Sequence, residues 1–246
     1  MLLLLPPSQT KRDGGADGSA LRLDSLGFPK LTPARRTVLG AVKALAADPA
    51  AMMAALRLGP KQHGEVARNK GIRRSALLPA LDRYTGVLYD ALDAGTLSES
   101  ARRFANDHLV IHSALFGLLR AGDPIPAYRL AHDSRLPELK LAKIWPEPIT
   151  AALASRSGLV LDLRSEAYVA LGPAPVGSFF LRLVSDGPDG HRRALNHFNK
   201  KGKGEFVRAV LDAGTDHADV ESLLSWAGET GLRLSRSGPG ELELVV

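Results

Sequence analysis

The chain of 246 residues contains no cysteine. This absence excludes disulfide bonds, thiolate nucleophiles, cysteine metal ligands and any thiol-based peroxide chemistry. Long apolar runs are also missing. No stretch approaches the roughly 18–20 apolar residues of a membrane-spanning helix, and Pro6 and Pro7 end the short run at residues 1–5, which lacks a basic leader. We therefore expect a cytoplasmic protein without a membrane partner.

Signatures of nucleotide and metal sites are absent as well. The chain has neither G-x-x-x-x-G-K-[ST] nor G-x-G-x-x-G, so it supports no Walker-type or dinucleotide site. His108 and His112 are spaced to share one helix face, as metal ligands require, but the glutamate that zinc proteases place between such histidines is missing. We expect no metal site and no cofactor, and the sequence does not indicate an oligomeric state.

What the chain does have is an excess of positive charge. Hydrophobic residues make up 45% and charged residues 24% of the sequence, as in ordinary globular proteins, and the net charge is +6. This balance favours polyanionic partners such as nucleic acid or nucleotides. Residues 57–74 concentrate cations against the single acid Glu65: Arg57, Lys61, Arg68, Lys70, Arg73 and Arg74. Such a cluster is either a solvated face or part of a polyanion-binding surface.

The order of apolar and turn-forming segments predicts an α+β fold in a single domain, residues 1–246. We expect a buried strand at residues 2–5, a flexible loop at 8–19 and a helix from Pro33 to about Ala47. Strands are predicted at residues 159–163 and 179–184, helices at 206–213 and 218–227, and a closing hairpin from 232–234 with 242–244. Strands and helices alternate without a regular βαβ period, which favours a mixed β core surrounded by helices.

The segment 196–204 is the most informative part of the chain for function. It places Lys200, Lys201 and Lys203 around two glycines, directly before the predicted helix at 206–213. Glycines let backbone N–H groups turn toward an anion, and a helix N-terminus adds partial positive charge. His197 and Phe198 add ring surfaces beside these charges. The segment predicts anion binding, and the alternative is a lysine-rich surface turn.

Three other places are candidates for function. Ser8 and Lys11 follow the first predicted strand, where α/β proteins often place ligand-binding loops. Gly117 is a candidate for the tight turn of a helix–hairpin–helix, which presents backbone N–H groups to one DNA phosphate. Asp162 and Glu166 bracket a strand end, as acid–base catalysts or as ordinary caps.

Seven segments, taken together and in order, resemble one protein family. They are Pro6-Pro7-Ser8 with Lys11; Tyr84-Thr85-Gly86-Val87-Leu88; Leu115-Phe116-Gly117-Leu118-Leu119-Arg120; Tyr128-Arg129-Leu130; Trp145 with Ile149-Thr150; Asp162-Leu163-Arg164-Ser165-Glu166-Ala167-Tyr168; and His197-Phe198-Asn199-Lys200. On these residues the chain resembles the peroxide stress protein YaaA family over nearly its full length, in a version similar to that of actinobacteria.

The resemblance implies a single domain whose β-rich core is wrapped in helices, with a helix–hairpin–helix element near residues 109–119. It also implies resistance to hydrogen peroxide, limitation of free iron, and non-specific binding of double-stranded DNA through a basic cleft. By the same resemblance, the cleft would be lined or approached by Lys11, Tyr84, Thr85, Arg129, Arg164, Asn199 and Lys200. Ala131 replaces a glutamate of the enterobacterial form, and Gln9-Thr10 replace Glu-Gly of the actinobacterial loop. These departures argue against acid–base catalysis there and leave polyanion binding intact.

Two main hypotheses follow. The leading one is a non-sequence-specific DNA-binding protein of the peroxide stress response that limits iron-dependent oxidative DNA damage. The alternative is an enzyme acting on a small phosphorylated or nucleotide-like substrate in a basic cleft, with specialised metabolism as one setting. Direct iron sequestration through His108 and His112 ranks last. In either main case the candidate ligand- or DNA-phosphate-binding residues are Ser8, Lys11, Tyr84, Thr85, Gly117, Arg129, Arg164, Ser165, His197, Asn199, Lys200, Lys201 and Lys203.

Overall fold

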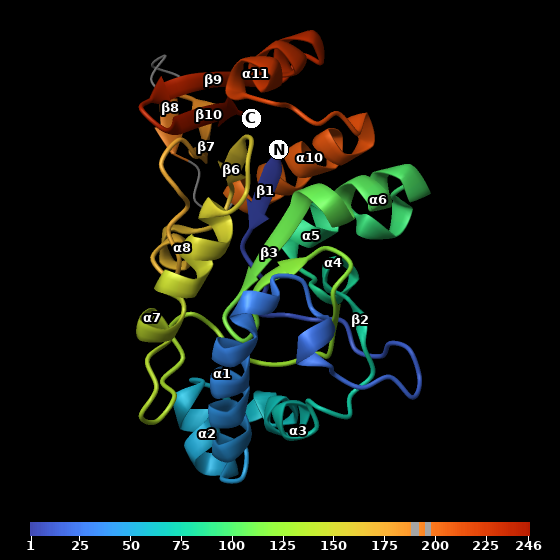
Figure 1. The fold of residues 1–246 in the computed structure, drawn as a ribbon, viewed down its shortest axis with the longest axis vertical. Helices are drawn as coiled ribbons and strands as arrows, with labels where there is room; N and C mark the ends of the chain where they lie inside the picture. The colour runs from blue at the N-terminus through green and yellow to red at the C-terminus, as the bar shows by residue number, and fades with distance from the viewer. Residues whose placement is uncertain (188–191, 195–197) are drawn as a thin grey trace.

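A mixed β-sheet forms the centre of the protein (Figure 1). The computed structural model describes residues 1–187, 192–194 and 198–246. Among these, the sheet has the order β4-β3-β1-β6-β7-β10-β9, and β8 also pairs with β7. The bounds are β1 Leu2–Leu5, β3 Leu109–Ser113, β4 Gly117–Arg120, β6 Val160–Asp162, β7 Phe179–Asp186, β8 Arg192–Ala194, β9 Arg233–Gly238 and β10 Glu241–Val245. The strands β3, β1, β6, β7 and β10 run parallel, whereas β4, β8 and β9 are antiparallel to their neighbours.

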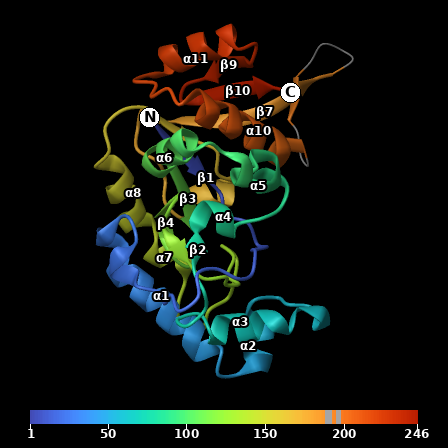
Figure 2. The same ribbon diagram turned by 90° about the vertical axis from the view of Figure 1, so that its right-hand side faces the viewer.

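Helices cover both faces of this sheet (Figures 1 and 2). On one face lie α5 (Val87–Leu92) and α10 (Phe198–Ala213), with α6 (Glu99–His108) beside them, and on the other lie α7 (Leu141–Ile144) and α8 (Pro146–Ala154). At one end of the molecule α1 (Thr32–Leu45), α2 (Pro49–Ala55) and α3 (Gly64–Lys70) form a helical lobe, and α11 (Val220–Glu229) lies at the other end beside β9. Short elements complete the fold: α4 (Ala80–Arg83), α9 (Glu166–Val169) and the pair β2 (Leu78–Pro79) and β5 (Pro124–Ile125).

The central strand β1 explains why the sheet is buried. Its four leucines are all buried, and parallel strands covered by helices on both faces are typically such continuous apolar runs. The predicted mixed β core surrounded by helices is therefore confirmed, together with the strand at residues 2–5, the helix that starts near Pro33 and the closing hairpin of β9 and β10. No helix in the described part of the chain is both long and apolar enough to cross a membrane.

The segment predicted as a helix–hairpin–helix is instead a β-hairpin. Residues 109–113 form β3, residues 117–120 form β4, and the two strands pair antiparallel. A short apolar run that is buried on all sides cannot be assigned to helix or strand by periodicity, and this one became the strand beside β1. For the same reason His108 and His112 do not share a helix face, because His108 ends α6 and His112 lies within β3.

The predicted anion-binding loop is also corrected. α10 begins at Phe198, so Lys200, Lys201, Gly202, Lys203 and Gly204 lie in its first turns and not in a loop before a helix at 206. A Cβ at Gly204 would lie 2.2 Å from the Leu88 carbonyl oxygen of α5, and one at Gly202 would lie 2.4 Å from Leu183 Cδ2 of β7. The glycines are therefore needed for the close approach of α10 to α5 and β7.

Gly204→Ala is expected to lower the free energy of unfolding by about 1–3 kcal/mol, because the Leu88 carbonyl belongs to a helix backbone that cannot rotate away from the new methyl group. Urea denaturation measures the change. Gly40→Ala is the matched control, since Gly40 is exposed within α1 and has open space at its Cβ position. That substitution is expected to add about 0.5–1 kcal/mol. Equal stabilities of the two variants would contradict the close-packing role.

Candidate functional site

In the described part of the chain, a cavity of about 580 Å³ at the carboxyl ends of β1 and β6 is the main candidate for a ligand site. From β1 the chain passes to β3 on one side, and it later returns to β6 on the other side of β1. In open α/β sheets, ligands bind outside the carboxyl ends of strands at such a change of direction. We call this cavity the switch-point pocket. Five segments line it: residues 6–10, 85–89 and 130–132, then Leu163, Ser165 and Tyr168, then Asn199, Lys200 and Lys203.

One wall of the switch-point pocket is the first part of α10. Asn199 and Lys200 lie four and three residues before Lys203, so each of them shares a helix face with Lys203. Lys203 is only 6% exposed, and its Nζ donates to the Leu163 carbonyl oxygen at 2.9 Å. Burial lowers the pKa of Lys203 to about 8, with Asp162 opposing and Arg182 assisting the shift. An amine with a pKa of about 8 is mostly cationic at neutral pH, and it can also exchange its proton close to that pH.

A second wall consists of hydroxyl groups. Ser8 Oγ lies 3.1 Å from Thr10 Oγ1, which donates to the Thr85 carbonyl oxygen at 3.3 Å. Gly86 has φ of 96°, and a Cβ there would lie 3.3 Å from both hydroxyl oxygens. This glycine therefore allows the loop after β1 to lie against the start of α5.

Lys11 lies behind this wall and does not line the pocket. Its Nζ donates to the carbonyl oxygens of Ser8 and Gln9 at 2.9 and 3.3 Å. It also lies 4.1 Å from the Tyr128 ring centroid and 5.2 Å from that of Tyr84, within cation–π range. Burial, with Arg129 as the next largest cause, lowers the pKa of Lys11 to about 7. Tyr84 is buried with it, and its hydroxyl lies 2.7 Å from that of Tyr128.

Arg164 is fully buried and bonded within the protein. Its Nε and Nη2 donate to the two Asp162 carboxylate oxygens at 2.8 and 2.6 Å, and its Nη1 donates to His112 Nδ1 and the Gly172 carbonyl oxygen, both at 2.9 Å. Burial and Arg164 hold the pKa of His112 well below its usual value, in keeping with a neutral ring that accepts this bond. Asp162 is thus part of a buried ion pair, and Glu166 is exposed and pairs with Arg182 at 3.4 Å. The two carboxylates do not form an acid–base pair.

The structure brings together six of the predicted site residues in the pocket lining: Ser8, Thr85, Ser165, Asn199, Lys200 and Lys203. Four others lie elsewhere. Gly117 is buried, and a Cβ there would meet the Trp145 ring at 2.7 Å, so its backbone cannot contact DNA. Arg129 donates to Gln9 Oε1 at 2.7 Å, Lys201 pairs with Glu205 at 3.1 Å, and Arg164 is internal. Lys11 and Tyr84 support the wall from behind, and His197 lies outside the described residues.

Among the pocket-lining residues that sequence reasoning did not predict as site residues are the three with aromatic or imidazole rings: Tyr89, His132 and Tyr168. Tyr168 belongs to the segment Asp162-Leu163-Arg164-Ser165-Glu166-Ala167-Tyr168, so its position after β6 was a usable signal. His132 lies two residues after Leu130 in an irregular segment, and nothing in the local sequence indicates that this segment turns toward β1.

The free energy of unfolding is expected to rise with pH between about 7 and 10.5 more steeply in the natural protein than in a Lys11→Met variant. Lys11 has a folded pKa of about 7, below its usual value of 10.5, so between these values the unfolded chain holds a proton that the folded chain has released. Stability then rises by at most about 1.4 kcal/mol per pH unit. Urea denaturation at pH 7, 8 and 9 measures the slopes. Parallel slopes would show that Lys11 is not buried as described.

Known proteins resemble this chain along most of its length. The family described as "Peroxide stress protein YaaA" matches residues 1–236. A UPF0246 protein of Corynebacterium glutamicum is 41% identical over 237 residues, which cover 94% of each chain. A UPF0246 protein of Corynebacterium efficiens is 40% identical over the full length of both chains. A UPF0246 protein of Streptomyces coelicolor is 39% identical over 249 residues, covering 98% of this chain and 94% of the relative.

Proposed function

The chain belongs to the peroxide stress protein YaaA family, and from that premise we propose that it is a cytoplasmic protein that binds a small phosphorylated molecule in the switch-point pocket. The observation that carries the proposal is the position of Lys203. This cation is only 6% exposed, so it lines the cavity beneath the surface of the protein. A DNA duplex presents its phosphates on a wide outer surface and could not reach it, whereas a small molecule that enters the pocket could.

The size and lining of the pocket support this proposal. A volume of about 580 Å³ lies within the range of roughly 300–1,000 Å³ that is typical of small-ligand sites. A phosphate group beside α10 would meet the ammonium groups of Lys200 and Lys203 and the positive end of a 16-residue helix. The Lys203 ammonium has three N–H groups, and one of them is used by the Leu163 carbonyl oxygen. The hydroxyls of Ser8 and Ser165 add donors on facing segments.

Lys203 also supports an enzymatic form of the proposal. Its pKa of about 8 lies close to the pH of the cell, which is the range in which an amine both gives up and accepts a proton readily. A bound phosphate would raise this pKa, because its negative charge favours the protonated amine. Lys203 would then hold its proton more firmly while the ligand is bound and release it more readily once the phosphate has left.

Lys200→Ala is expected to weaken the binding of ribose 5-phosphate about tenfold, because a charge-assisted contact to phosphate is lost. A titration followed by ³¹P NMR measures the affinity. Lys201→Ala is the matched control, since the neighbouring Lys201 is exposed, pairs with Glu205 and does not line the pocket. That variant should bind as the natural protein does. Equal losses in both variants would point to general surface charge and contradict a phosphate site in the pocket.

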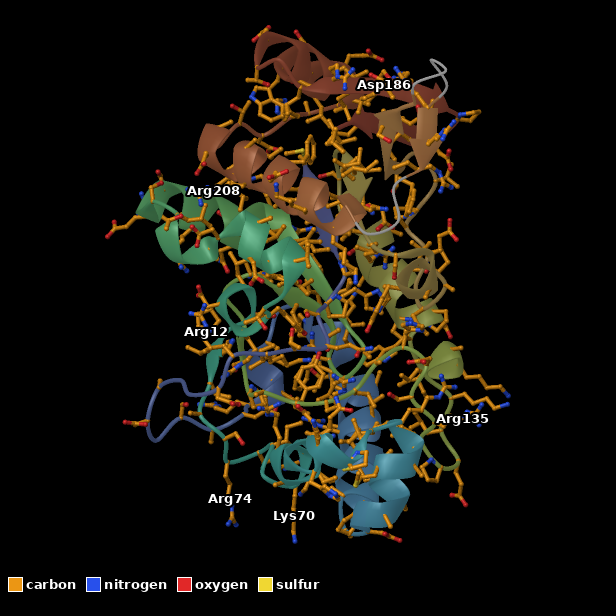
Figure 3. The ribbon with its side chains drawn as sticks, turned by 180° about the vertical axis from the view of Figure 1, so that it is seen from behind. Arg12, Lys70, Arg74, Arg135, Asp186 and Arg208 are labelled. Atoms are coloured by element: carbon orange, nitrogen blue, oxygen red, sulfur yellow. The ribbon has the colours of Figure 1, made fainter. Side chains whose placement is uncertain are left out.

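Non-specific binding of double-stranded DNA is a second candidate function, and the helical lobe supports it. Of the six cations in residues 57–74, Arg57 pairs with Asp133, and Arg68 pairs with Glu65 and Asp13. The other four are exposed, and in the part of the chain that the structure describes no carboxylate pairs with them: Lys61, Lys70, Arg73 and Arg74. Lys70 and Arg74 project from the end of the molecule (Figure 3). Such a surface could neutralise duplex phosphates without entering the pocket.

Replacement of these four cations by alanine is expected to flatten the salt dependence of DNA binding, because each lost phosphate contact lowers the slope of log K against log salt by about 0.9. Fluorescence anisotropy with a short duplex at several salt concentrations measures the slope. The control variant loses the same charge at four exposed positions on other elements: Arg103, Lys140, Lys143 and Arg156. If the natural protein shows no salt dependence, or both variants lose it equally, the helical lobe is not a DNA surface.

A further inference from the structure

Besides its lysines and hydroxyl groups, the lining of the switch-point pocket contains several rings. The chain has few aromatic residues, 5% of the total, and only four tyrosines. Two of them, Tyr89 and Tyr168, line this cavity together with the imidazole of His132. Pro6, Pro7 and Leu130 extend the same apolar surface. A phosphate needs none of these groups, whereas a planar ring attached to the phosphate could pack against them.

The rings are held in place from behind. Tyr168 contacts His132 edge to face with centroids 5.4 Å apart, and it contacts His112 in the same manner at 5.3 Å. His112 is itself fixed by Arg164, whose guanidinium is held by the Asp162 carboxylate. His132 is exposed, whereas Tyr168 is buried except where it borders the cavity. The imidazole of His132 is thus a supported, accessible surface on which a planar group could stack.

Asn199, which lines the pocket, carries an acceptor without a partner in the described part of the chain. The side-chain oxygen of Asn199 is buried and has no hydrogen-bond partner among the described residues. Buried acceptors without a partner are rare, and they point to a donor that belongs at the site. A phosphate dianion has no proton to donate, whereas sugar hydroxyls and ring N–H groups do. A ligand that satisfies this acceptor and also binds the two lysines would combine an anion with a hydroxyl or N–H donor.

These observations rest on the phosphate site of the proposed function and extend it. We propose that the ligand of the switch-point pocket is a nucleoside phosphate, with its phosphate beside Lys200 and Lys203, its sugar near Asn199, and its base against His132 and Tyr168. Each part of the ligand then meets groups of matching chemistry: ammonium groups with phosphate, an amide oxygen with hydroxyls, and rings with the planar base. A sugar phosphate without a base would leave the ring surface unused.

The test compares ribose 5-phosphate with AMP and UMP, each titrated into the natural protein and followed by ³¹P NMR. The nucleotides are expected to bind about tenfold or more tightly than ribose 5-phosphate, because base stacking adds to the phosphate contact. His132→Ala should bring the ratio of nucleotide affinity to ribose 5-phosphate affinity close to one. His132→Phe should restore it, because the ring surface is retained. His63→Ala, an exposed histidine outside the pocket, is the control and should leave the ratio unchanged.

The outcomes separate the two proposals. If ribose 5-phosphate binds and depends on Lys200 but the nucleotides bind no better, the nucleoside phosphate is overturned and the phosphate site stands. If none of the three compounds binds, both proposals are overturned. If the nucleotides bind more tightly and His132→Ala keeps that advantage, the assignment of the base to His132 is overturned. Thermal unfolding of each variant confirms that it folds.

Discussion

The close approach of α10 to α5 and β7 is the constraint on which the site depends. It is possible only because Gly202 and Gly204 have no side chain at two points where helix backbone and sheet side chains lie within contact distance. With α10 held there, Asn199, Lys200 and Lys203 face the carboxyl ends of β1 and β6. The same contact sets the position of α5, whose first residues form another part of the pocket wall. The packing of α10 against α5 therefore positions two of the five segments that line the cavity.

Buried cations also support the pocket, because they form hydrogen bonds with groups inside the protein. Arg164 holds Asp162 and His112 under one side of the pocket, and Lys11 holds the carbonyl oxygens of Ser8 and Gln9 on another. Arg83, also fully buried, donates to the carbonyl oxygens of Arg12, Gly14 and Ala76 and so fixes the loop after β1. Such groups cost free energy to bury, and full hydrogen bonding offsets that cost. Their positive charge is used for structure, and the exposed and pocket-lining cations remain for ligands.

The sequence predicted the regular elements well where a local signal was strong. Four consecutive leucines before Pro6 and Pro7 indicated β1, and Pro33 indicated the start of α1. The prediction from sequence failed where two different structures produce the same pattern of residues. Residues 109–113 are all buried and begin with three apolar residues, so the alternation of a half-exposed strand is missing and a helix was expected. Gly202 and Gly204 resemble the glycines of an anion-binding loop, although the backbone there is helical and the glycines permit packing.

For this protein the sequence alone determined the family, the mixed α and β class, the central strand and the concentration of lysines near residue 200. These follow from local composition and from motifs in a fixed order. Only the tertiary structure decided which cations face a ligand. Lys11, Arg164 and Lys203 look equivalent along the chain, and all three bond to groups inside the protein. Of the three, Lys203 alone also lines the cavity. The direction in which a side chain points depends on elements that lie far away in sequence, and no local pattern contains that information.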